Sequence, residues 1–295
     1  MKIKRRKRSR WASTLAGTGW GESTFAEVAW DKSRGAAGRW AVGGIVSGAV
    51  LALIANLPAA WVASALASTT GQRLMLADAR GTLWSGSAVA VLTGGPQSRD
   101  ASALPGRIEW TLSLRGLGLE LTARHACCLN GAIGVHVKPG FGRLALTLAP
   151  RQGWVGQWPS AWLGGLGTPW NTLQLGGAVR LASPGVTVET VQGRWRVDGQ
   201  ADIEFLGVSS RMTTLSTLGN YRMSLSGNGA QGGTSQLKLS TQDGALQLSG
   251  DGTLGPSGVK FRGEARADAA DEPALNNLLN IIGRREGARS VISIG

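Results

Sequence analysis

The chain has 295 residues, of which 45 are Gly and 12 are Trp, and its formal net charge is +13. This length is enough for one sizeable core or two smaller ones. Ten Lys and Arg against three acidic residues give residues 1–39 a charge of +7, which is about half of the total. The remaining charges are dispersed with mixed sign, so we expect no nucleic-acid partner.

The first 39 residues predict a basic cytoplasmic tail. Trp11, Trp20 and Trp30 lie among Gly, Ser and Ala residues without any hydrophobic period, which is typical of a disordered segment. The basic cluster from Lys2 to Arg10 is typical of a topogenic or lipid-headgroup signal.

Residues 40–62 predict a single transmembrane helix. No charged residue lies between Arg39 and Arg73, and an uncharged apolar run of this length can span a bilayer. The basic flank before the run predicts that the N-terminus is cytoplasmic and that residues 63–295 lie in the periplasm of a bacterium. The residues expected to hold this inner-membrane anchor in lipid are Trp40, Val50, Leu51, Leu53, Ile54 and Trp61.

A cleaved secretory signal is the alternative, because Ala65-Leu66-Ala67 resembles a cleavage site. The long leading segment and the long apolar run favour the uncleaved anchor.

Residues 63–295 predict a mainly β domain. Apolar residues alternate with polar or small ones, as in Ile108, Trp110, Leu112 and Leu114, and this period of two gives a strand one apolar face. We expect an elongated, twisted antiparallel sheet, and the pattern leaves open whether it rolls or forms a groove. Turn dipeptides predict hairpins between the strands: Pro184-Gly185, Asp198-Gly199, Gly227-Asn228, Asp243-Gly244 and Asp251-Gly252.

Two segments interrupt the alternation and predict short helices, at about 159–166 and 273–283. Pro159 can open the first, and acidic residues precede an apolar helical face in the second. The first segment is rich in Trp, so it is either a hydrophobic plug over one end or edge of the sheet or a docking surface with aromatic anchors. The interaction candidates are Trp158, Trp162, Leu166, Trp170 and Asn171.

No catalytic motif is recognisable, so we predict no enzyme, no cofactor and no small-molecule substrate. His125 and His136 are separated by predicted turns, which argues against a metal site.

Cys127 and Cys128 are neighbours, which seldom form a disulfide, and without nearby His partners they would make a poor zinc site. We expect them to be small buried hydrophobes. Asp78 is expected to serve a turn.

Four segments resemble the type II secretion system protein N family (GspN): Ala79–Ala88, Leu104–Trp110, Pro159–Gly177 and Asn277–Gly295. The resemblance implies a single-span inner-membrane protein whose periplasmic β-rich domain contacts other secretion components and supports export of folded proteins across the outer membrane. It implies no catalytic residues and does not extend to the tail. The sheet pattern is more weakly similar to AsmA-type proteins, which implies the alternative of a periplasmic groove that binds or transfers lipid.

Overall fold

The computed structural model describes residues 40–191, 194–228, 234–255 and 258–295. The predicted tail lies outside the described residues. The chain divides into two compact units, residues 1–55 and residues 56–295.

In the first unit, residues 40–55 are helical and all of them are exposed. The helix that the sequence predicts over residues 40–62 is therefore divided. Among the described residues, no helix combines the length and the apolar content that crossing a bilayer requires.

The division falls at Pro58, where the chain is extended and joins the second unit. Pro58 forms a β-bridge with Thr82, and the carbonyl of Leu57 accepts a hydrogen bond from the Leu83 amide at 2.7 Å. A new helix, α2 (Ala59–Thr69), begins directly after the proline, which suits the start of a helix because it has no amide hydrogen to donate. Trp61, predicted at a membrane interface, lies in α2 and is 66% exposed.

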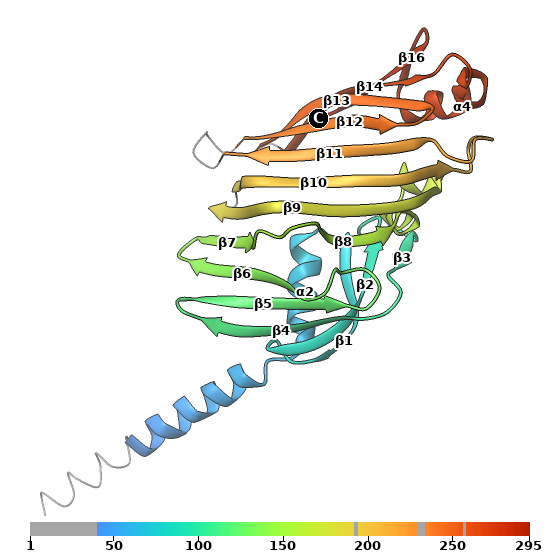
Figure 1. The fold of residues 1–295 in the computed structure, drawn as a ribbon. Helices are drawn as coiled ribbons and strands as arrows, with labels where there is room; N and C mark the ends of the chain where they lie inside the picture. Colours follow the sequence, from blue (N-terminus) through green and yellow to red (C-terminus); the bar gives the residue numbers. More distant parts are fainter. Residues whose placement is uncertain (1–39, 192–193, 229–233, 256–257) are drawn as a thin grey trace, which may run out of the picture. The chain divides into compact units, whose positions relative to one another are not determined.

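Among its described residues, the second unit is built on one 16-stranded sheet whose paired strands are all antiparallel (Figure 1). The strands in the first half of the sheet are β1 (Leu74–Gly81), β2 (Ser85–Thr93), β3 (Ala101–Ala103), β4 (Ile108–Arg115), β5 (Gly118–His125), β6 (Ile133–Gly140), β7 (Arg143–Leu148) and β8 (Trp154–Pro159). The second half holds β9 (Leu175–Val191), β10 (Arg194–Ser210), β11 (Gly219–Gly227), β12 (Ser235–Asp243), β13 (Leu246–Gly255), β14 (Gly258–Ala267), β15 (Arg284–Glu286) and β16 (Arg289–Ile294).

The strands follow one another in chain order from β4 to β14, except that β8 pairs with the first part of β9, and β7 pairs with its last part. Strand ends therefore alternate between two edges of the sheet. We call the edge at which β4, β6, β9, β11 and β13 end the hairpin edge. The opposite edge, with the connections from β2 to β4, β5 to β6, β7 to β9 and β14 to β16, is the plug edge.

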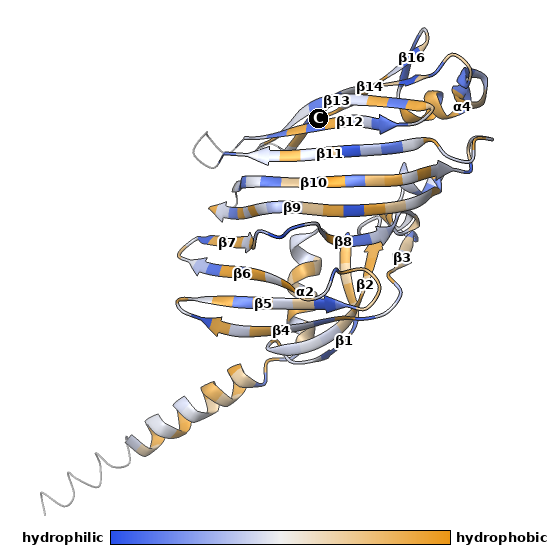
Figure 2. Ribbon diagram, in the orientation of Figure 1, coloured by the Kyte–Doolittle hydropathy of each residue, from blue (hydrophilic) through white to orange (hydrophobic). Residues whose placement is uncertain are grey.

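The strand register gathers the apolar residues on one face, because directly paired residues point to the same side of a sheet. One row of paired residues crosses five strands: Leu112, Leu121, Val135, Leu148 and Val186. On the other face Glu204 forms ion pairs with Arg222 at 2.8 Å and Arg180 at 3.8 Å. Figure 2 shows this alternation of hydrophobic and hydrophilic residues along the strands. The predicted alternation is confirmed.

Two helices cover the ends of this apolar face. Ala59 of α2 packs with Ala88 and Trp110, next to β1 and β2. At the other end lies α4 (Glu272–Ile282), which confirms the helix predicted at 273–283. Its buried residues pack against Tyr221 and Leu246, and the Tyr221 hydroxyl donates to the Leu246 carbonyl at 3.0 Å. Burial raises the pKa of Tyr221, so the hydroxyl stays protonated and keeps this bond.

Several predicted hairpins are wrong. Three turn dipeptides lie inside strands: Pro184-Gly185, Asp198-Gly199 and Asp251-Gly252. The first two lie on adjacent strands beside the point where β9 and β10 change register, and Gly185 and Gly199 both have positive φ. The glycines thus belong to a local irregularity in the pairing of β9 with β10. Both strands continue past it, and each is 17 residues long. Asp243-Gly244 does join β12 to β13, and Gly227 ends β11.

Replacing Leu279 by Ala should lower the free energy of unfolding by about 2–5 kcal/mol, because a fully buried side chain leaves a cavity between α4 and the sheet. Ile281→Ala is the matched control on the same helix. This side chain is 37% exposed, so its removal should cost about 1 kcal/mol or less. Urea denaturation of the purified chain measures both values, and equal losses would contradict the packing described for α4.

Candidate functional site

The Trp-rich segment lies at the plug edge. After β8, residues Ser160–Leu166 form a 3₁₀ helix, η1, which confirms the short helix predicted at 159–166, and α3 (Trp170–Leu173) follows. Trp158 and Trp162 are half-buried against a cluster of Ala90, Leu104 and Cys128. The Trp162 Nε1 donates to the Ser102 carbonyl at 3.0 Å. These contacts favour a plug that covers this edge of the apolar face.

The other interaction candidates lie further along the same segment. Leu166 and Trp170 are half-buried, whereas Asn171 is exposed, and its Nδ2 donates to Asp100 Oδ1 at 2.8 Å. All five candidates are therefore on one segment, and the exposed end of that segment is near Asn171. Their contact with a partner stays a prediction.

The turn between β5 and β6 differs from its prediction. Cys127 and Cys128 are joined by a disulfide, although they are neighbours in the chain. The statement that no His lies near them is also wrong, because one ring nitrogen of His125 and the two sulfur atoms all lie within 4.8 Å of one another. The signal for this proximity in the sequence is the two-residue spacing from His125 to Cys127, which a comparison of His125 with His136 leaves out.

His125 ends β5 on the apolar face, opposite Ile108. It is 6% exposed, and neither ring nitrogen has a hydrogen-bond partner among the described residues. Burial lowers the pKa of His125, so the imidazole is neutral near pH 7. Gly106 lies against the ring: a Cβ there would be 3.5 Å from the His125 Cε1.

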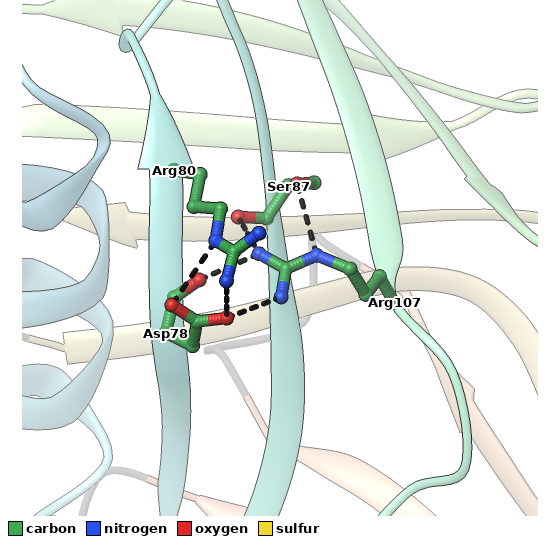
Figure 3. A network of polar contacts seen from close by, with 4 residues as sticks. All are labelled: Asp78, Arg80, Ser87 and Arg107. Carbon is green, nitrogen blue, oxygen red and sulfur yellow. Dashed lines mark hydrogen bonds and ion pairs between the residues drawn. The ribbon is translucent and has the colours of Figure 1, made fainter.

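A polar network lies in β1, where Asp78 interrupts the pairing with β2 (Figure 3). Arg107 donates to Asp78 Oδ2 and to the Asp78 carbonyl, both at 2.6 Å, and to Ser87. The Arg107 hydrogen bond, followed by that of Arg80, holds the pKa of Asp78 below its usual value. Asp78 thus lies in a bulge within a strand, whereas the sequence predicts a turn. Through Arg107, the network connects the loop before β4 to β1 and β2.

The hairpin edge carries exposed apolar side chains. Leu114 is 78% exposed and Trp195 is 50% exposed, although both belong to the apolar face. Leu117 and Phe141 at the tips of the first two hairpins are fully exposed. The apolar face is therefore covered at the plug edge and at both ends, and its side chains reach solvent at the hairpin edge. The sequence pattern contains these residues but does not say which edge is covered.

A family model described as type II secretion system (T2SS), protein N matches residues 72–293. This range takes in the whole sheet except the last residue of β16, together with the Trp-rich segment and α4. No curated protein and no solved structure matches the chain. Because the family match covers well over half of the sequence, the chain belongs to the type II secretion system protein N family.

Proposed function

We propose that this protein is a non-enzymatic inner-membrane component of the type II secretion system. The family match over residues 72–293 carries this proposal. In the periplasm, the sheet domain contacts other components of the system and so supports the export of folded proteins across the outer membrane.

The proposed anchor is the uncharged segment that begins at Trp40, with the N-terminus in the cytoplasm. The exposure of every residue in the helix over 40–55 and the absence of charge between Arg39 and Arg73 support it. The helix break before Pro58 gives the chain a natural place to leave the membrane and enter the sheet domain.

The proposed contact surface is the exposed end of the Trp-rich segment. Trp158 and Trp162 are held by their own packing, so this part of the segment is preorganised. Trp170 and Asn171 lie beyond it, where a partner can reach an exposed amide and part of an aromatic ring.

A photo-crosslinking side chain placed at Asn171 should capture another type II secretion component in intact cells. The matched control is the same side chain at Arg262, which is exposed on the polar face of β14. Capture from Asn171 alone supports the proposed surface. Equal capture from both positions, or none from Asn171 while the cells secrete normally, contradicts it.

A second candidate function is lipid binding, and a specific observation favours it. The apolar face continues from β4 to β14, while α2 and α4 pack only near its ends. Side chains in its middle, such as Val137, Leu146 and Val188, are half-buried. An acyl chain lying along this face would remove more apolar area from water, at about 25 cal/mol for each Å².

Lipid that co-purifies with the chain can be measured by mass spectrometry, and Leu114→Asp should lower its amount several-fold. Leu114 is exposed on the apolar face at the hairpin edge, so a charge there opposes an acyl chain without disturbing a core. Ser113→Asp, one residue earlier on the polar face, is the control and should retain the lipid. If the wild-type chain carries no lipid, or if both variants lose it equally, the apolar face is not a lipid site.

A further inference from the structure

We propose that His125, Cys127 and Cys128 form a binding site for a thiophilic d¹⁰ cation, Zn²⁺ or Cu⁺, once the disulfide between the two cysteines is reduced. The site lies at the last residue of β5 and in the turn that follows it, at the plug edge. It is independent of the proposed secretion function and of the lipid alternative.

The geometry supplies three ligand atoms on one short turn. The two sulfur atoms and one imidazole nitrogen of His125 lie within 4.8 Å of one another. Around a tetrahedral zinc ion, with Zn–S of about 2.3 Å and Zn–N of about 2.0 Å, two ligand atoms are roughly 3.5–3.8 Å apart. The cluster is therefore close to the required spacing, and the sulfur atoms need only separate after the S–S bond is broken.

The state of His125 supports a ligand role. A buried polar atom normally has a hydrogen-bond partner, yet both ring nitrogens of His125 lack one among the described residues. A neutral imidazole offers such a nitrogen lone pair to a metal. A cation would give one of these nitrogens the partner that it otherwise lacks.

The two cysteines have different environments. Cys128 is 3% exposed and belongs to the cluster against which Trp158 and Trp162 pack, whereas Cys127 is exposed and its sulfur lies 3.6 Å from the Pro105 carbonyl. Solvent can therefore reach the site from the side of Cys127, while Cys128 and His125 are fixed by their surroundings. Three protein ligands with one side open leave room for a water molecule as a fourth ligand.

Reduction requires an external dithiol. Its thiolate attacks the exposed sulfur of Cys127, which forms a mixed disulfide and releases Cys128 as a thiolate. The second thiol of the donor then breaks the mixed disulfide and frees Cys127. The donor leaves oxidised to a disulfide, and the protein has gained two electrons and two protons. When the cation binds, the two thiol protons pass to solvent.

Metal titration of the purified full-length chain tests the site, with Zn²⁺ and Cu⁺ each competing against a chromophoric chelator. After reduction the chain should bind one equivalent of at least one of the two ions, and before reduction it should bind none. Co²⁺ in place of Zn²⁺ should give a sulfur-to-metal charge-transfer band. Because Trp158 and Trp162 pack against Cys128, tryptophan fluorescence should also change on binding.

Variants test two of the three ligands. Cys127→Ser and His125→Phe should each weaken binding by at least about tenfold. Even the loss of a residue that only hydrogen-bonds to a metal ligand lowers metal affinity by about this factor, and the loss of a ligand should cost more. His136→Ala, which changes the other histidine of the chain, should leave the affinity unchanged. Cys127 is exposed, so its variant remains informative if His125→Phe fails to fold.

Three results would overturn the proposal. The reduced chain could bind neither ion, the oxidised chain could bind as tightly as the reduced one, or a folded His125→Phe variant could keep its full affinity.

Discussion

The apolar face of the sheet is the constraint on which the rest of the structure depends. A strand with period two buries one side only, so a sheet of such strands needs a cover for that side. Here the cover comes from α2 and α4 near the ends and from the Trp-rich segment along the plug edge. Each covering element lies at a point where the chain leaves the alternating pattern. The proposed lipid surface is the part of the apolar face that these elements leave uncovered. The proposed contact surface is the exposed end of the Trp-rich segment, which is itself one of the covering elements.

Much of the fold could be predicted from the sequence, because it depends on local patterns. Alternating apolar residues locate the strands, and the acidic start and helical face of residues 273–283 locate α4. The errors arise where long-range pairing overrides a local signal. Asp198-Gly199 has the composition of a hairpin turn, but pairing on both sides of β10 keeps it inside a strand. The helix predicted over residues 40–62 is a second case. Hydropathy contains no information on the pairing of Leu57 and Pro58 with the turn after β1, which divides this helix.

The candidate site could be predicted only in part. The Trp-rich segment stands out in the sequence, and the structure shows why two of its tryptophans favour a plug: they pack against residues from β2 and from the β2–β4 connection, which are far away in the chain. His125, Cys127 and Cys128 are close in the sequence, so their proximity could be predicted from their spacing. The burial of His125 and the exposure of Cys127 could not be predicted, because both depend on the neighbouring loops.

The two outermost strands of the sheet have a consequence for assembly. Within the described residues, the main strand order of the sheet ends at β1 and at β15, and each of these borders is a template on which another chain could add a strand. One border, β1, is interrupted by the bulge at Asp78 and carries the charges of Asp78 and Arg80. The other, β15, is three residues long and consists of Arg284, Arg285 and Glu286. Irregularity, charge and short length all discourage edge-to-edge polymerisation, so this large sheet can remain discrete at high local concentration.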